Sequence, residues 1–394
     1  MNITGIIAEY NPFHFGHKYH IEQAKKITKS DGIIIIMSGN FMQRGIPAIT
    51  NKFNRAKTAI YGGADLVIEL PLIHSVASAE NFAQGAVTIL DKINVCDNLF
   101  FGAETNNIKD LTTTASILSN ENTNFKLSLS KNLKLGLPYH IARANALMSI
   151  SNEIDFSNLL NSSNNILAIE YIKALQKLKS NIKPFALKRV GSSYNDNKIE
   201  GRFSSATAIR KGILENKDIN NVIPRETYNV LHSSNTSFPE DMFSYIRYKL
   251  LTCSENLKKI PDTNEGLDKK IVKEILNAHN LDSLILNAKS KRYTYTRISR
   301  ILTNFFIGLE NYNISNIKND SYSYVRPLAF NNTGRKILKE IKLNSSLNII
   351  TKIPKNTTNN SLLYDIAGTK AYSIINNSTK AYDDYFISPS YIDM

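Results

Sequence analysis

The first hundred residues alternate between short apolar runs and segments with helical spacing, and this alternation constrains the fold more than any other feature. The run at residues 32–37, Gly-Ile-Ile-Ile-Ile-Met, suits a strand that is buried on both faces. Such alternation is typical of βαβ units and predicts an α/β fold with a Rossmann-like, doubly wound parallel sheet. Ligands of such sheets gather at the carboxyl ends of the strands. Expected strands span residues 3–8, 32–37, 66–70 and 98–102, and expected helices span 18–30, 54–62 and 78–91.

The pattern changes further along the chain. After about residue 216 the alternation stops, and helical patterns joined by Asn- and Ser-rich links continue to residue 311. We therefore expect two units, one at residues 1–215 and a mainly helical one at residues 216–394. Other expected elements are helices within 106–180, a strand at 182–190, helices at 204–214 and 334–343, and a strand-like piece at 348–353.

Three histidines, His14, His17 and His20, follow the first expected strand at the mouth of a helix. A helix start offers unpaired N–H groups and the positive end of the helix dipole, which favour a phosphate group. Gly16 would let the backbone approach a nucleotide, and His14 and His17 can donate hydrogen bonds to phosphate oxygens. The histidine spacing matches no common zinc signature. The motif therefore predicts a phosphate site, with no zinc or other metal bound by the protein itself.

Two candidates follow later strands. Arg44 lies in the loop after the second expected strand, where its planar guanidinium could bind a phosphate or a carboxylate. The alternative is a surface arginine in a loop. Gly102 ends the strand at 98–102, where it would let an adenine or a ribose lie against the backbone, or it is a plain turn glycine.

Basic and hydroxyl side chains complete the candidate set. Lys188 and Arg189 lie at the end of the strand expected at 182–190. Ser205 and Thr207 are placed to cap a helix and to bond a phosphate, and Arg210 lies close to one helical turn beyond them. A capped, solvated helix is the alternative interpretation.

The positive charge of the chain is unevenly distributed. Residues 1–100 hold nine basic and eight acidic side chains, whereas residues 286–355 hold thirteen basic and three acidic ones. Basic clusters with interleaved aromatic rings are typical of RNA-binding surfaces, although a solvated basic surface has the same composition. If Tyr293 and Arg297 instead form a helix packing face, their spacing would be explained without RNA. The expected RNA-binding residues, placed on one helix, are Arg292, Tyr293, Tyr295, Arg297 and Arg300.

Several longer strings make the chain similar to a known family. The HxGH element at 14–17 and the T-x-x-R element at 207–210 resemble those of the HIGH superfamily of nucleotidyltransferases. Residues 5–17 (GIIAEYNPFHFGH), 39–45 (GNFMQRG) and 63–71 (GADLVIELP) resemble the bacterial tRNA(Met) cytidine acetate ligases within it. Agreement continues at 164–171, 188–191, 293–297 and 325–330, so the resemblance covers nearly the whole chain.

The resemblance implies an enzyme that activates acetate with ATP and passes the acetyl group to tRNA. Acetate would attack the α-phosphate, giving acetyl-adenylate and pyrophosphate, and N4 of the wobble cytidine (C34) in the anticodon loop of elongator tRNA(Met) would accept the acetyl group. It implies a catalytic, ATP-binding unit at 1–215, a tRNA-binding one at 216–394, and catalytic roles for His14, His17 and Arg210. Magnesium is expected with ATP. One departure is Asn195, where the family leads us to expect histidine. The ATP-binding residues implied are Ile7, Ala8, Glu9, Tyr10, Asn11, Pro12, Phe13, His14, Phe15, Gly16, His17, Lys18, Tyr19, His20, Gly102, one of Asn164 and Asn165, Lys188 and Arg189.

Two other interpretations stay open at the level of the sequence. One is a nucleotidyltransferase that adenylylates a phosphorylated small metabolite, although this reaction leaves the basic C-terminal part unexplained. The other is an ATP-sensing RNA-binding protein without turnover. The sequence has no apolar stretch long enough to span a membrane and no secretory signal pattern, so we expect a cytoplasmic protein.

Overall fold

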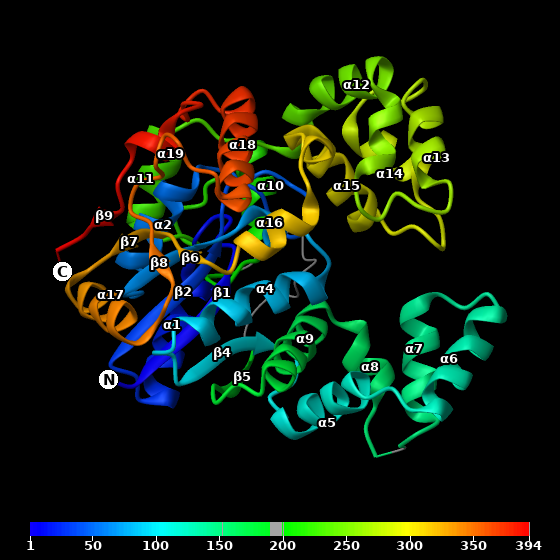
Figure 1. The fold of residues 1–394 in the computed structure, drawn as a ribbon, viewed down its shortest axis with the longest axis horizontal. Coiled ribbons are helices and arrows are strands. Elements are labelled where there is room, and N and C mark those ends of the chain that lie inside the picture. The colour runs from blue at the N-terminus through cyan, green and yellow to red at the C-terminus, as the bar shows by residue number, and fades with distance from the viewer. Residues whose placement is uncertain (152, 190–198, 200, 394) are drawn as a thin grey trace.

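The core of the molecule is a seven-stranded sheet (Figure 1). The computed structural model describes residues 1–151, 153–189, 199 and 201–393. The strand order is β5-β4-β1-β2-β3-β7-β9, and all neighbours from β5 to β3 are parallel. The predicted fold class and the five predicted strands of residues 3–190 are confirmed. The strands are β1 (Ile3–Ala8), β2 (Gly32–Ser38), β3 (Leu66–Leu70), β4 (Asn98–Ala103), β5 (Lys183–Lys188), β7 (Pro327–Phe330) and β9 (Ser390–Tyr391).

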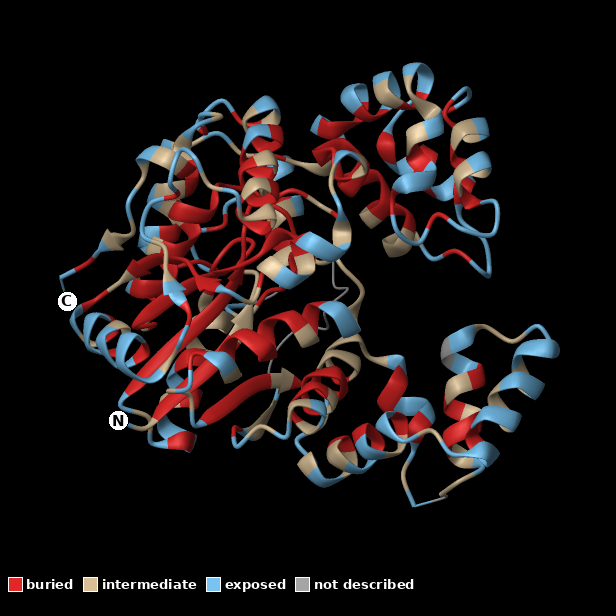
Figure 2. Ribbon diagram, in the orientation of Figure 1, coloured by how far each residue is buried: buried red, intermediate tan, exposed pale blue. Residues whose placement is uncertain are grey.

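Helices cover both faces of this sheet, as the buried isoleucine run of β2 requires. Ile34 and Ile36 point to one face and Ile33 and Ile35 to the other, because successive side chains of a strand alternate. Both pairs are fully buried, and Figure 2 shows the central strands in the colour of buried residues. The first face packs against α4 (Ala79–Lys92), α9 (Ser163–Leu178) and α17 (Asn332–Asn344), and the second against α1 (Phe15–Thr28) and α2 (Lys52–Tyr61).

The end of the chain returns to this sheet. β7 pairs antiparallel with β3, and β9 pairs parallel with β7. A buried ion network holds the returning segment: the Lys52 ammonium lies 2.8 Å from both Glu69 and Asp384, and the Arg326 guanidinium lies 3.0 Å from Glu69 and 2.9 Å from Asp384. The sheet therefore runs across the division expected at residue 215/216.

Two groups of helices extend from the sheet at separate places (Figure 1). One follows β4, and its α6–α7 hairpin lies farthest from the sheet. The other precedes α16 and ends in α15. The first group comprises α5 (Ile108–Ser119), α6 (Thr123–Lys134), α7 (Tyr139–Met148) and α8 (Phe156–Asn161), and the second comprises α12 (Phe243–Thr252), α13 (Leu267–Glu274), α14 (Leu281–Ala288) and α15 (Tyr295–Ile307).

The remaining elements are short or lie around the sheet. Among the described residues, none of the helices combines the length and apolar character needed to cross a membrane. The remaining short or peripheral elements are α3 (Leu72–Ser75), α10 (Ala206–Leu214), α11 (Arg225–Ser233), α16 (Ile314–Asp320), β6 (Tyr324–Val325), β8 (Asn348–Ile349), α18 (Asn360–Ile375) and α19 (Asp383–Phe386).

Candidate active site

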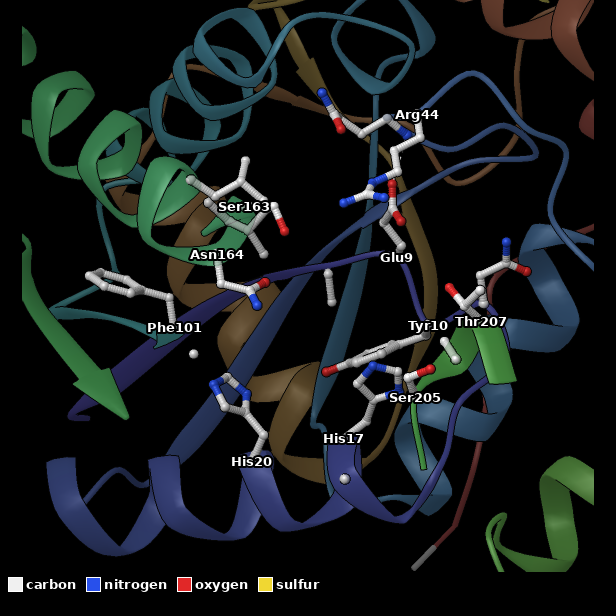
Figure 3. Close-up of a pocket in the computed structure, with 18 of the residues that line it drawn as sticks. Glu9, Tyr10, His17, His20, Arg44, Phe101, Ser163, Asn164, Ser205 and Thr207 are labelled. Carbon is white, nitrogen blue, oxygen red and sulfur yellow. Dashed lines mark hydrogen bonds between the residues drawn. The ribbon is translucent and has the colours of Figure 1, made fainter. Parts of the chain in front are cut away.

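A cavity of about 660 Å³ opens at the carboxyl ends of the central strands (Figure 3). The first residues of five helices, α1, α4, α9, α10 and α15, contribute to its wall. Each helix start carries partial positive charge and free N–H groups, so their convergence favours a strongly anionic ligand. Four arginines add full positive charge to the wall: Arg44, Arg189, Arg210 and Arg300.

The three histidines of the predicted motif line one end of this cavity. The His14 and His17 rings stack with centroids 3.6 Å apart, and His20 lies one turn further along α1. A Cβ on Gly16 would approach the His14 ring to 2.9 Å, so glycine lets this ring sit over the helix start. Among the described residues, neither His14 Nδ1 nor His20 Nε2 has a hydrogen-bond partner, although both atoms are buried. Such atoms are free to meet a ligand.

The electrostatic surroundings hold these rings in the neutral form. Burial, with Arg189 and Arg210 nearby, lowers the pKa of His14 to about 3. Burial and Arg189 lower the pKa of His20 to about 4, and burial followed by the neighbouring His14, His20 and Arg189 holds the pKa of His17 well below its usual value. A neutral imidazole donates one hydrogen bond. The full positive charges at this site therefore come from arginine.

Two arginines fix the backbone at the end of β1. Arg55 donates to the Glu9 carbonyl at 2.6 Å, and Arg210 donates to the Asn11 carbonyl at 2.6 Å. Tyr10, between these two carbonyls, has a φ of 49°. This value lies in the left-handed region, where residues other than glycine are strained by roughly 1–2 kcal/mol. The two arginine contacts therefore brace a strained turn that leads directly into the histidine motif.

The asparagine pair at the start of α9 divides into two roles. Asn165 is buried, and its Oδ1 accepts the backbone N–H of Glu104 at 2.8 Å, which ties α9 to the end of β4. Asn164 lines the cavity, and its Nδ2 donates to the Glu104 carboxylate at 2.7 Å. Asn164 is therefore the member of the pair that can reach a ligand.

The opposite end of the cavity contains Glu9 and residues of the loop after β2. The Glu9 carboxylate accepts the backbone N–H of Gln43 at 2.6 Å. In Figure 3, Glu9 and Arg44 lie on the side of the cavity away from His20. The Gly45 carbonyl accepts hydrogen bonds from Ser299 and Thr303 of α15, each at 2.7 Å. Helix α15 thus anchors the loop that carries Gln43 and Arg44.

The chain matches known proteins over nearly its whole length. The family model described as HIGH Nucleotidyl Transferase matches residues 1–385. Two tRNA(Met) cytidine acetate ligases, from Clostridium novyi and Clostridium perfringens, are 49% and 47% identical, with 100% and 99% of both chains covered. The chain belongs to the tRNA(Met) cytidine acetate ligase family of HIGH nucleotidyl transferases.

Solved structures of the family agree with the fold. The crystal structure of Thermotoga maritima TmcAL without ligand is 31% identical and superposes with a TM-score of 0.92, with 100% of both chains covered. The same Thermotoga protein bound to alpha-thio ATP superposes with a TM-score of 0.89, again with full coverage.

Most of the residues expected from the family to bind ATP lie together in this cavity. Those that line it are Ile7, Ala8, Glu9, Tyr10, Asn11, His14, Gly16, His17, Tyr19, His20, Gly102, Asn164 and Arg189, with the phosphate candidates Arg44, Ser205, Thr207 and Arg210. The other expected residues, Pro12, Phe13, Phe15, Lys18, Asn165 and Lys188, are not among the lining residues. Phe13 is fully buried instead, where its ring approaches Gly62. Asn195, the departure from the family pattern, lies outside the described residues.

The expected RNA-binding residues do not share one helix. Helix α15 begins at Tyr295, so Arg292 and Tyr293 lie before it, and this part of the prediction was wrong. Tyr293 is buried and donates to the Glu265 carbonyl at 2.7 Å, while Tyr295 donates to Asp282 at 2.9 Å. Both tyrosines therefore pack within the helical group, whereas Arg300 lines the cavity.

Sequence reasoning missed three residues that shape this site. Arg55 is buried and binds carbonyls of Glu9, Ser38, Gly39 and Thr50, yet a lone arginine in a helical pattern carries no motif. Phe82 and Tyr171 line the cavity from α4 and α9. Their spacing resembles that of ordinary core residues, so only the fold shows that they face the cavity.

Proposed function

We propose that this protein is an ATP-dependent ligase that forms acetyl-adenylate from acetate and transfers the acetyl group to N4 of the wobble cytidine of elongator tRNA(Met). One observation carries the proposal. The HxGH helix α1 and the T-x-x-R helix α10 both start at one cavity and are joined by the hydrogen bond from Arg210 to the Asn11 carbonyl. The relatives named tRNA(Met) cytidine acetate ligase and the Thermotoga structure with alpha-thio ATP support the same activity and cosubstrate.

The first step requires charge stabilisation more than proton transfer. Acetate is already a nucleophile at neutral pH, so attack on the α-phosphate needs no general base. The triphosphate would lie against the start of α1, where His14 and His17 donate N–H groups and Arg189 and Arg210 balance the negative charge. The donors act where charge builds up on the bridging oxygen as pyrophosphate leaves.

The base and ribose of ATP would lie at the ends of β4 and β5. A Cβ on Gly102 would meet nothing closer than 3.6 Å, so the glycine leaves an open surface beside Arg189 and His20. Asn164 adds a hydrogen-bonding group on this side of the cavity, while Ser205 and Thr207 line it beside Tyr10 and His17 (Figure 3). Magnesium would enter with the triphosphate and take most ligands from phosphate and water oxygens.

The helical group ending in α15 would hold the tRNA. Arg297 and Arg300 are one turn apart on α15, and Arg300 lines the cavity while Arg297 donates to the Asp262 carbonyl at 2.7 Å. Arg292 precedes the helix and is exposed. We assign catalysis and ATP binding to residues 1–215 and RNA contacts to the helical part of residues 216–394, with the returning strands completing the sheet.

The test follows two products in one reaction. Protein is incubated with ATP, magnesium and labelled acetate, with and without bulk bacterial tRNA, and pyrophosphate and N4-acetylcytidine are measured. Label in tRNA as N4-acetylcytidine supports the proposal. Pyrophosphate without labelled tRNA would favour a nucleotidyltransferase with another acceptor, and the absence of both products would favour an ATP-sensing RNA-binding protein.

A further inference from the structure

One acidic side chain stands out in an otherwise positive cavity. Among the described residues that line it, Glu9 alone is acidic, beside four arginines and five helix starts. A carboxylate repels triphosphate and acetate, so Glu9 is poorly suited to hold either of these anions. Its place in the wall makes sense if it faces a hydrogen-bond donor.

The position of Glu9 is fixed from several directions. Arg55 holds its carbonyl, and the backbone N–H of Gln43 holds its Oε1 at 2.6 Å. The Gln43 side chain is itself fixed by the Ala77 carbonyl at 2.8 Å. The Glu9 Oε1 is held by the Gln43 backbone hydrogen bond, and in Figure 3 the carboxylate lies beside the Arg44 side chain in the cavity wall. The backbone contacts therefore fix where Glu9 presents its carboxylate to the cavity.

The walls around this end of the cavity suit a planar ring. Phe82, Leu167 and Tyr171 line the cavity from α4 and α9. The Phe101 ring lies 5.7 Å from the Tyr171 ring and, in Figure 3, on the His20 side. Burial, followed by the neighbouring Glu9 carboxylate, raises the pKa of the Tyr171 phenol. Tyr171 therefore stays protonated beside Glu9, and apolar and aromatic walls next to a carboxylate match a nucleobase that carries an amino group.

We propose that Glu9 accepts a hydrogen bond from the N4 amino group of the acceptor cytidine and takes its proton during acyl transfer. This role rests on the proposed function. N4 attacks the acetyl carbonyl carbon, the new N–C bond forms, and the C–O bond to the adenylate phosphate breaks. One N4 proton moves to the Glu9 carboxylate, and AMP leaves as its phosphate anion, so atoms and charges balance.

The chemistry explains why a base is needed in this step and not in the first. The N4 lone pair is delocalised into the cytosine ring, which makes it a weak nucleophile. After attack the nitrogen is positively charged until it loses a proton, and a positioned carboxylate accelerates such a step by roughly 10²–10⁴-fold. Acetate carries no proton to lose, so Glu9 has no comparable task during adenylation.

Glu9→Gln tests this role because glutamine keeps the shape of the side chain and can still accept from Gln43. Acetate-dependent exchange between ATP and pyrophosphate reports the first step, and rapid-quench transfer from enzyme-bound acetyl-adenylate to tRNA reports the second. We expect transfer to slow at least about a hundredfold and exchange to fall far less than transfer, because the N4 proton is lost only in the second step. Glu22→Gln, an exposed carboxylate on α1, is the matched control and should change neither step.

Each other outcome would overturn the role. Equal losses in both steps would make Glu9 a contact for the nucleotide or its magnesium ion. Unchanged transfer in Glu9→Gln would show that the proton goes elsewhere. Wild-type protein that exchanges pyrophosphate but never labels tRNA would overturn the proposed acceptor, and with it the role of Glu9, whereas a labelled wild type confines the result to Glu9 itself.

Discussion

The two ends of the cavity are built in different ways. The histidine end comes from one stretch of chain, His14 to His20, at the start of a single helix. The Glu9 end is assembled from the end of β1, the loop after β2, and helix α15, which bonds that loop at Gly45. A continuous stretch can be read as a motif, whereas an assembled surface becomes visible only after folding. We assign the first chemical step to the continuous end and the second to the assembled end.

The largest expected effect separates the two ends directly. His17→Ala should lower acetate-dependent exchange of pyrophosphate into ATP by at least about a hundredfold, because it removes a donor to the charge that builds up at phosphorus. Binding of tRNA, measured by filter retention, should stay within about twofold. His279→Ala, an exposed histidine outside the cavity, should keep wild-type exchange of pyrophosphate into ATP. Loss of tRNA binding with normal exchange would reverse our assignment of the two ends.

A smaller effect is expected at the assembled end. Arg300→Ala removes a cation from the cavity wall next to the acceptor, so kcat/KM for tRNA should fall about tenfold and the salt dependence of tRNA binding should flatten by about one phosphate contact. Pyrophosphate exchange without tRNA should change little. Arg335→Ala on α17 is exposed on another part of the surface and serves as the control. An unchanged salt slope would place the RNA surface elsewhere.

Gly102→Ala examines the nucleotide surface without disturbing the fold. The added Cβ would lie 3.6 Å from the Arg189 side chain and 3.9 Å from His20, which are ordinary contacts. The melting temperature should therefore stay the same. The KM for ATP should rise several-fold, up to about tenfold, because the methyl group would occupy space taken by the ribose or base. An unchanged KM would remove Gly102 from the ATP site.

The smallest expected effect is a pH dependence of stability that arises at the histidine end. The folded pKa values of His14 and His20, about 3 and about 4, lie below the unfolded value of 6.5. The unfolded chain therefore binds more protons, so stability is complete above pH 6.5 and decreases as pH falls toward 4. His20→Gln should reduce this slope in melting curves recorded between pH 7.5 and 4.5. Identical slopes in the two proteins would contradict the low pKa of His20.

Sequence reasoning succeeded for continuous stretches of chain and failed for features assembled from distant segments. The isoleucine run at 32–37 determined a strand buried on both faces, and the neighbouring strands and the mostly parallel sheet were predicted correctly. The return of β7 and β9 to the sheet was not foreseen, because two- and four-residue strands leave almost no periodicity. Tyr293 and Arg297 were interpreted as a nucleic-acid surface on one helix. The structure shows instead that the Tyr293 hydroxyl donates a hydrogen bond to the Glu265 backbone carbonyl.

The return of the last strands has a consequence for how the chain is synthesised. Until residue 330 has left the ribosome, β3 remains an open edge whose backbone groups have no partner on that side. Lys52 and Glu69 likewise lack Arg326 and Asp384, so a nascent chain would hold an incomplete ion network at the end of β3. A fragment that ends before β7 would keep the histidine motif, yet its β3 edge would be unpaired and able to pair with another chain. Translation must therefore reach β7 and β9 before the seven-stranded sheet can be completed.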